Sequence, residues 1–422
     1  MNEKPIYSDR YKGYVLLILT GVYTFNFIDR QILVILQESI KGELGLSDTQ
    51  LGLMTGLTFA LFYVTLGIPI ARFSDRSNRR NIVALSLAIW SAMTALSGLV
   101  MNYTQLLLAR IGVGIGEAGG SPPSHAMISD YFPPEKRATA LSIYSMGIYI
   151  GILLGYLGGG WIDQHYGWRM AFFALGIPGI LYALILMFTV KEPPRGLTDK
   201  VPSRENNSSF AESIKNMFSI KTFTLMALAS GLHTFGNYGM GNFFAPFLAR
   251  VHGMEVGAIG LWLGVCVGFG GMIGTYLGGF LADRMGKKNI KWYLLVPTIA
   301  NLISLPLMAM VIFIGNTTIV LVAYFFVALI TAIYMGPCLA VAHNLVQANM
   351  RAQASAVFFL VLNLIGLGFG PLIIGILSDF FEPNYGVESL RWAFCSVFLT
   401  SSAAMFLFYT AANNYEKDLL QK

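Results

Sequence analysis

Charged residues are scarce in this sequence. Its 422 residues include 28 lysines and arginines and 22 aspartates and glutamates, or 12% of the chain, whereas an ordinary soluble protein holds about 25%. Hydrophobic residues make up 55%. So few charges could not keep a compact globule in solution, and the excess of apolar residues predicts a helical protein that crosses a membrane many times.

Cysteine and the patterns of common active sites are also scarce. Cys266, Cys338 and Cys395 lie in apolar stretches without C-x-x-C spacing, so we predict neither a disulfide framework nor a zinc site. The five histidines are scattered, and no Ser/His/Asp pattern is present. We therefore expect no enzyme activity, no metal and no cofactor.

Long apolar runs recur along the whole chain. A lipid-exposed segment must satisfy its backbone hydrogen bonds internally, and no alternating pattern of barrel strands is present, so each run is expected to be a helix. The sequence thus predicts an all-α integral membrane protein with 12 transmembrane helices. The runs are 14–36, 50–71, 82–101, 105–131, 138–162, 169–190, 222–248, 256–281, 292–314, 318–348, 352–378 and 392–411.

Lysine and arginine are distributed unequally between the loops. If the N-terminus is cytoplasmic, 22 of the 28 fall on the cytoplasmic side, 4 fall outside, and Arg30 and Arg110 lie within spans. This bias predicts that both termini are cytoplasmic. The basic excess is then a signal of topology and implies no nucleic-acid partner. Short loops and the absence of a targeting segment favour a bacterial inner membrane.

The two halves of the chain repeat each other. The loop Asp75–Arg80 returns half a chain later as Asp283–Lys288, and Arg137-Ala-Thr-Ala returns as Arg351-Ala-Gln-Ala. Duplicated six-helix units are typical of transporters that bind substrate between repeats. We expect an N-terminal half (1–190), a cytoplasmic linker (191–221) and a C-terminal half (222–422).

These loops resemble a signature of the major facilitator superfamily. The pattern Gly-x-x-x-Asp-Arg-x-Gly-Lys-Lys is complete at Gly279–Lys288 and partial at Ala71–Arg80, and Arg110–Gly116 fits the superfamily's fourth-helix pattern Arg-x-x-x-Gly-x-Gly. Within the superfamily, Asn26–Arg30, Asp75–Arg80 and Arg110–Ala118 look like the Spinster group of sphingolipid and lysolipid transporters. The resemblance implies the two-half fold and transport by alternating access. It also implies cytoplasmic latches formed by Asp75, Arg76 and Arg137 and by Asp283 and Arg351.

Four ionisable residues lie inside predicted spans: Asp29, Arg30, Arg110 and Glu117. Charge in a bilayer costs about 3 kcal/mol or more per group, so such residues usually face a cavity and mark a functional site. Our hypothesis is that Asp29 and Glu117 are the protonatable switch, with Arg110 deciding which carboxylate is charged. Arg30 could hold an anionic headgroup. The alternative is a static charge network.

The predicted spans of the second half contain no aspartate, glutamate, lysine or arginine. An apolar, aromatic half that faces a charged half would suit an amphipathic substrate whose headgroup binds to the first half. We therefore add Phe235, Asn237, Tyr238 and His343 to Arg30, Arg110 and Glu117 as candidate substrate-binding residues.

Together these observations predict a proton-coupled secondary transporter of an amphipathic or lipid-like molecule. It is expected to act as a monomer, with protons, a small substrate and the lipid bilayer as its partners. Two alternatives remain open: a small organic-anion/proton symporter of the same superfamily, and a membrane receptor that does not transport.

Overall fold

The computed structural model describes residues 7–74, 76–197, 210–347 and 350–420. These residues form helices and turns without a strand, which confirms the expected all-helical class. Eight stretches of the described chain are long and apolar enough to cross a membrane, and one of them, Gln353–Leu420, runs over several helices. Helix α1 (Asp9–Leu44), which carries Asp29 and Arg30, is not among the eight.

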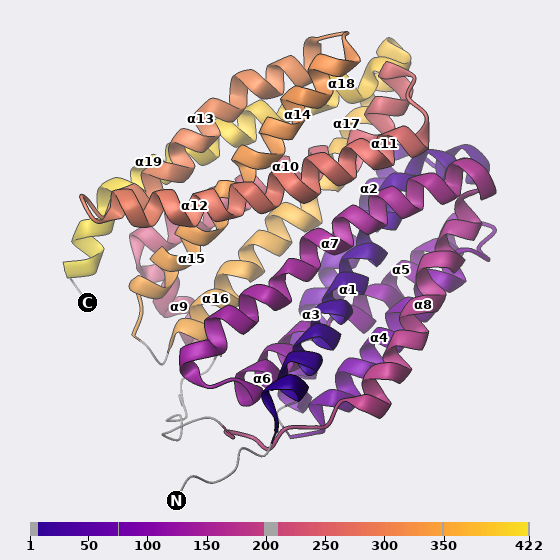
Figure 1. Cartoon of the computed structure of the whole chain (residues 1–422). Helices are drawn as coiled ribbons and strands as arrows, with labels where there is room; N and C mark the ends of the chain where they lie inside the picture. Colours follow the sequence, from indigo (N-terminus) through magenta and orange to yellow (C-terminus); the bar gives the residue numbers. More distant parts are fainter. Residues whose placement is uncertain (1–6, 75, 198–209, 348–349, 421–422) are drawn as a thin grey trace, which may run out of the picture. The chain divides into compact units, whose positions relative to one another are not determined.

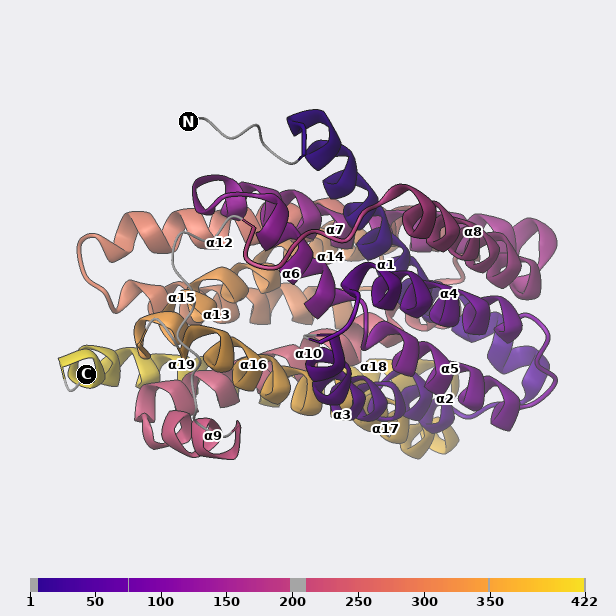
Figure 2. The same ribbon diagram turned by 90° about the horizontal axis from the view of Figure 1, so that it is seen from below.

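The chain divides into two compact units. The first contains Met1–Leu44, Leu61–Ser203 and Val256–Leu261. Within it α1 runs beside α7 (Figure 1), and α4 lies between α5 and α8 (Figure 2). Besides α1, its helices are α3 (Leu57–Ser74) from Leu61 onward, α4 (Arg79–Ser97), α5 (Tyr103–Glu117), α6 (Ser121–Tyr131), α7 (Pro134–Tyr166) and α8 (Trp168–Thr189).

The second unit contains Gly45–Ala60, Arg204–Glu255 and Trp262–Lys422. Residues 45–60 thus precede most of the first unit in sequence and yet pack with the second. The expected domain limits at 190 and 222 stay a prediction. The helices of the unit, with α11 entering from the first unit, are α2 (Asp48–Thr55), α9 (Phe210–Ser219), α10 (Lys221–His252), α11 (Val256–Leu263), η1 (Gly264–Phe269), α12 (Gly270–Gly286), α13 (Trp292–Phe313), α14 (Thr317–Thr331), η2 (Ala332–Tyr334), α15 (Met335–Asn344), α16 (Arg351–Val361), η4 (Leu362–Phe369), α17 (Gly370–Tyr385), η5 (Gly386–Glu388), α18 (Ser389–Phe394) and α19 (Ser396–Leu420).

Short polar residues set where several helices begin. At the start of α4, the side chain of Asn78 accepts a hydrogen bond from the backbone N–H of Asn81. At the start of α5, the side chain of Asn102 accepts one from the backbone N–H of Gln105. Ser47 and Gln50 form a reciprocal capping box at the start of α2. Each cap satisfies a donor that has no partner within its own helix. The sequence therefore fixes these helix starts locally.

Large apolar side chains lie on the outside of the protein as well as in its core. Phe188 is 80% exposed, and Leu399 is 76% exposed. A soluble domain rarely leaves contiguous apolar surface of this kind in contact with water. The exposed side chains are those of a protein whose helices face lipid.

Glycines bring α7 very close to α1. A Cβ at Gly151 would lie 2.4 Å from the carbonyl oxygen of Thr24, and one at Gly147 would lie 2.6 Å from that of Thr20. Gly155 and Gly159 continue the same face against α1. Since successive glycines are four residues apart, they form one ridge along α7. This ridge positions α1, and with it Asp29 and Arg30.

Candidate functional site

Helix α1 carries two adjacent charges into the interior of the first unit. The side chain of Asp29 is fully buried, and that of Arg30 is 18% exposed. Neighbours on an α-helix point about 100° apart. Arg30 therefore reaches α5, whereas the Asp29 carboxylate faces α4.

Arg30 pairs with Glu117, the last residue of α5. Its Nε lies 2.7 Å from Oε2 of Glu117, which is fully buried. The guanidinium also lies over two aromatic rings, 5.2 Å from the centroid of Phe27 and 5.1 Å from that of Tyr63. Cation–π contacts add to the ion pair and keep the arginine among apolar neighbours.

Asp29 has weaker partners. Ser91 Oγ donates to its Oδ2 at 3.4 Å, and NH1 of Arg110 donates to the main-chain oxygen of Asp29, not to the carboxylate, at 3.2 Å. Three buried atoms of the cluster have no hydrogen-bond partner among the described residues: Oδ1 of Asp29, Oε1 of Glu117 and Nε of Arg110. Buried polar atoms of this kind are uncommon and often mark a site with a chemical role.

The structure thus brings Asp29, Arg30, Arg110 and Glu117 together within one unit, and the role of Arg110 in deciding which carboxylate is charged stays a prediction. The guanidinium that binds Glu117 is that of Arg30. Arg110 precedes Glu117 by seven residues on the same helix, about 10 Å along the axis. The sequence could place Asp29 and Arg110 at similar depth and Glu117 about 10 Å deeper, but it could not choose which arginine pairs with which acid.

The candidate residues of the second half lie on two helices of the second unit. On α10, Phe235 is buried, Tyr238 is half-buried and Asn237 is exposed. His343 lies near the end of α15, where its Nε2 is 2.7 Å from Oγ of Ser355. Their role in binding a substrate stays a prediction.

Among the predicted latch residues, Asp75 lies outside the described residues. Arg76 is exposed, and Arg137 donates to the main-chain oxygen of Ser129 at 2.9 Å. Asp283 accepts the hydroxyl of Tyr293 at 2.8 Å, and Arg351 begins α16. The latches therefore stay a prediction.

Arg79, in the loop Asp75–Arg80, is the centre of an ion-pair network that the sequence did not predict. Each nitrogen of its guanidinium faces an acceptor. Arg79 NH1 lies 2.5 Å from Asp130, and its Nε lies 2.7 Å from Glu192. Its NH2 donates to the main-chain oxygen of Pro193, and the backbone N–H of Gly196 donates to Asp130. We name these residues the Arg79 network. Its members are distant in sequence, and only the signature containing Arg79 indicated its importance.

A second missed network lies in the second unit, at the start of α2. Both guanidinium NH groups of Arg250 donate to the Asp48 carboxylate, at 2.6 and 2.8 Å, and Ser378 Oγ donates to it at 2.7 Å. Asp379 in turn accepts the backbone N–H groups of Asp48 and Thr49 at 2.9 and 2.8 Å. A carboxylate at a helix N-terminus is favoured by the orphan donors and by the helix dipole. We name these residues the Asp48 network.

Beyond the predicted end of the first span, Glu43 binds the Trp168-Arg169 pair at the start of α8. Trp168 Nε1 donates to Glu43 at 2.6 Å, and Arg169 forms an ion pair with it. These hydrogen bonds hold the pKa of Glu43 below its ordinary value. On α18 of the second unit, Arg391 likewise pairs with an acid, Glu388.

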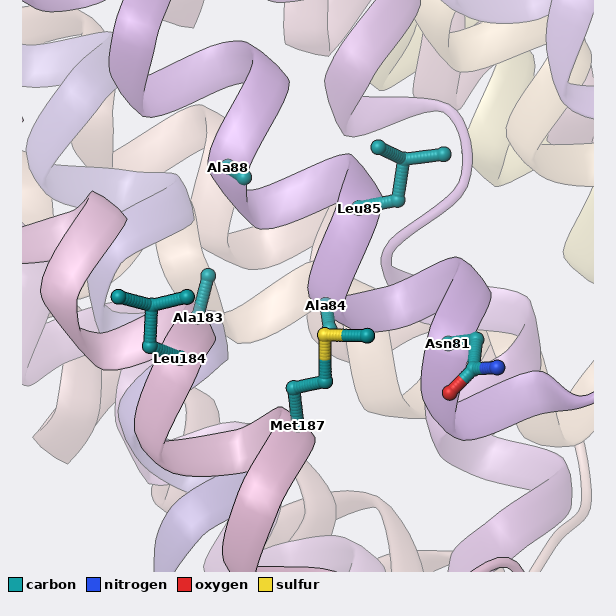
Figure 3. Close-up of a pocket in the computed structure, with 7 residues that line it drawn as sticks. All are labelled: Asn81, Ala84, Leu85, Ala88, Ala183, Leu184 and Met187. Carbon is teal, nitrogen blue, oxygen red and sulfur yellow. The ribbon is translucent and has the colours of Figure 1, made fainter.

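The first unit has a shallow, mostly apolar hollow on its surface. The hollow, of about 270 Å³, lies between α4 and α8 and is lined mainly by Ala84, Leu85, Ala88, Leu184 and Met187 (Figure 3). Leu85 and Leu184 are themselves exposed. This hollow does not include the buried charges and gives no argument about a substrate. The described residues also contain no group of acidic, histidine or cysteine side chains that could hold a metal ion.

Comparison with known proteins agrees with this architecture. The sequence model of the Major Facilitator Superfamily matches residues 19–371. A relative described as an MFS-type efflux pump of Mycolicibacterium smegmatis is 31% identical over 414 residues, which cover 96% of this chain and 94% of that protein. The hexuronate transporter of Bacillus subtilis is 26% identical, covering 88% of this chain and 89% of the relative.

A similar solved structure is a bacterial homologue of the human lysosomal transporter Spinster, in an inward-facing and unoccupied conformation. Its TM-score to this chain is 0.88 at 32% sequence identity, with 98% of this chain and 99% of the other covered. This similarity confirms the Spinster resemblance that the motifs of the first half indicated.

Proposed function

This chain belongs to the Major Facilitator Superfamily, and from that premise we propose that it is a proton-coupled transporter of an amphipathic anion. It is a multi-pass membrane protein of a transporter family rather than an enzyme. Proton coupling and the class of substrate are the proposed part.

The observation that carries the proposal is the pairing of Arg30 with Glu117 beside the unpaired atoms of Asp29, Glu117 and Arg110. A buried carboxylate oxygen without a donor destabilises the charged form of its group. A proton removes that penalty. Asp29 and Glu117 are therefore suited to take up and release protons during a transport cycle.

The same pairing supplies a coupling mechanism. The Glu117 carboxylate is bound to the Arg30 guanidinium, with Oε2 2.7 Å from Nε. An anionic headgroup that binds to Arg30 must therefore compete with this carboxylate. Protonation of Glu117 weakens the ion pair and leaves the Arg30 guanidinium available. By linkage, proton binding then strengthens substrate binding and substrate binding strengthens proton binding. The expected outcome is that proton and anion move together.

The aromatic rings around Arg30 favour a substrate with an apolar part. Phe27 and Tyr63 flank the guanidinium, so an anion bound there would meet apolar surface directly beside its charge. Similarity to the sphingosine-1-phosphate transporter of Danio rerio, which is 25% identical over 409 residues, supports a lipid-like substrate such as a sphingoid phosphate. The similarity to a hexuronate transporter supports the second candidate, symport of a small organic anion through the same arginine.

Reconstitution in liposomes tests the proposal. We would measure uptake of a fluorescent lysolipid and of a small dicarboxylate, each with and without an imposed pH gradient. Lysolipid uptake driven by the gradient is the expected result. Dicarboxylate uptake alone would assign the protein to the anion symporters, and saturable binding without uptake would favour a receptor.

The Glu117→Gln variant tests the coupling mechanism. Because glutamine cannot exchange a proton, we expect the dependence of uptake on the pH gradient to fall by about tenfold or more, while the affinity for the anion loses the part of its pH dependence that comes from Glu117. Asp9→Asn, at a carboxylate that is 87% exposed, is the control and should behave as the unmodified protein. Full gradient dependence in both Glu117→Gln and Asp29→Asn would contradict the proposal.

Orientation and assembly belong to the same proposal. We propose that both termini face the cytoplasm, that the protein acts as a monomer in a bacterial inner membrane, and that the predicted loop latches hold one conformation. The unequal distribution of lysine and arginine supports the orientation. Protease protection of tags on each terminus in intact cells would test it.

A further inference from the structure

The second unit holds a buried histidine whose surroundings differ from those of an ordinary core residue. His233, on α10, is 4% exposed. Its Nδ1 lies 2.9 Å from Oδ1 of Asn301 on α13, and its Nε2 lies 2.9 Å from the main-chain oxygen of Thr331. Both ring nitrogens therefore face an oxygen that accepts hydrogen bonds.

The orientation of the Asn301 amide is fixed by a separate bond. Nδ2 of Asn301 donates to the main-chain oxygen of Pro297 at 2.9 Å. Turning the amide over would place its oxygen against that carbonyl oxygen and lose the bond. The side of Asn301 that faces His233 is therefore the acceptor.

The second acceptor is equally well defined. Thr331 ends α14, and the chain continues as the short 3-10 segment η2. A break of this kind interrupts the regular i to i−4 hydrogen bonds and releases carbonyl groups, which side chains must satisfy inside a membrane. The carbonyl oxygen of Thr331 cannot donate under any circumstances.

A neutral imidazole has one N–H group and one bare nitrogen. Either neutral tautomer would place a nitrogen lone pair 2.9 Å from an oxygen lone pair, at Asn301 or at Thr331. The imidazolium, which has two N–H groups, satisfies both contacts at once. We propose that His233 is a proton-binding site, separate from Asp29 and Glu117, and that its protonated form holds α10, α13 and the end of α14 together.

The other groups around the ring are neutral. The ring of Tyr334 of η2 lies beside it, with the centroids 4.5 Å apart and the planes tilted by 52°, and the Tyr334 hydroxyl lies 3.1 Å from Thr234 Oγ1. Cys338 of α15 lies beside Ser230, which precedes His233 by about one turn on α10. No carboxylate or cation interacts with the ring within the described part of the chain.

This environment makes the proton conditional on the packing. An imidazolium without a counter-charge is costly to bury, and here the two acceptors reduce that cost by accepting its hydrogen bonds. If the end of α14 moves away from α10, the Nε2 contact is lost and the neutral ring is favoured. If the proton leaves Nδ1 first, the Asn301 side chain must turn over or move away from His233, because two lone pairs would otherwise face each other. Proton binding and the contact of α10 with α13 and α14 are therefore linked.

This inference does not depend on proton-coupled transport, and its test needs no substrate. We would label the full-length protein with 15N-histidine in lipid nanodiscs and record the ring-nitrogen resonances from pH 5 to pH 9. The His233 signals would be assigned by elimination, with variants that replace the other four histidines one at a time. The expected result is two protonated nitrogens at the acidic end and, with rising pH, a change to one bare nitrogen.

Two comparisons make the result specific. Asn301→Leu removes one acceptor and should shift the loss of the second proton to lower pH, whereas Asn301→Asp supplies a negative charge and should shift it to higher pH. His343, whose partner Ser355 can either donate or accept, is the internal control and should not respond to either change. A His233 ring with one bare nitrogen over the whole pH range would overturn the proposal.

Discussion

At the scale of single residues, the buried charges of the first unit fall into two kinds. In the Arg79 network, the guanidinium donates to Asp130, Glu192 and the main chain of Pro193. In the cluster around Glu117, one oxygen of each carboxylate has no partner among the described residues. Since unpaired buried atoms carry the full penalty of desolvation, we interpret the saturated network as structural and the unsaturated one as functional.

The structural interpretation predicts a large loss of stability in Arg79→Ala. Removing the arginine leaves two carboxylates without their cation, which typically costs about 3–5 kcal/mol. We expect a marked fall in the melting temperature of the detergent-solubilised protein, followed by intrinsic fluorescence. Arg76→Ala, at an exposed position in the same loop, should change it little. Equal melting temperatures for the two variants would show that the Arg79 network contributes nothing.

At the scale of helices, four glycines of α7 determine the position of α1. Gly147, Gly151, Gly155 and Gly159 allow the backbones of α7 and α1 to approach within contact distance. Glycine in a helix has an intrinsic cost of about 1 kcal/mol relative to alanine, so a ridge of four is explained by packing. The position of Asp29 and Arg30 depends on that contact.

The ridge predicts opposite effects for two alanine substitutions on α7. In Gly151→Ala, the new Cβ would lie 2.4 Å from the Thr24 oxygen, and such overpacking typically costs about 1–3 kcal/mol. In Gly158→Ala, the nearest atom is 3.6 Å away, so better helix propensity should stabilise by up to about 1 kcal/mol. Melting temperatures measured side by side would check this, and a stabilised Gly151→Ala would contradict the close approach.

At the scale of the whole molecule, sequence order and packing differ at α2. This helix lies in the first half of the sequence, yet it packs in the second unit with α17. Gly52 approaches the carbonyl oxygen of Pro371, and Gly375 approaches that of Asp48. Together with the bonds from Ser378 and Asp379 in the Asp48 network, these contacts join segments more than 300 residues apart.

The Asp48 network predicts that Arg250→Gln loosens α2. The variant leaves the buried carboxylate of Asp48 without its cation. Every 1.4 kcal/mol of stability lost raises the population of molecules with α2 detached about tenfold. We expect a cysteine introduced at Thr55, which is 9% exposed, to react with a water-soluble maleimide roughly tenfold faster or more. The background would carry Cys395→Ser, since the other two cysteines are buried.

Glu382→Gln provides the matched control for this experiment, because Glu382 is an exposed acid on α17 close to Asp379. It should leave the labelling rate of Cys at position 55 unchanged. An unchanged rate in Arg250→Gln as well would show that the glycine contacts alone hold α2 in place.

The sequence by itself determined the class of fold, the family and the location of the ionisable residues within the chain. These follow from hydropathy, from motifs a few residues long and from the rarity of charge inside apolar runs. Local capping also fixed several helix starts, such as that of α4 after Asn78. Such features depend on neighbours in sequence, and a single sequence displays them directly.

Only the tertiary structure decided which groups meet. It paired Glu117 with Arg30, bound Asp48 to Arg250, and placed two acceptors around His233. Such contacts join residues from different helices, and a change of a few ångströms in helix position or of 100° in rotation would exchange one partner for another. Helix periodicity fixes the face of a residue, whereas packing between helices fixes its partner.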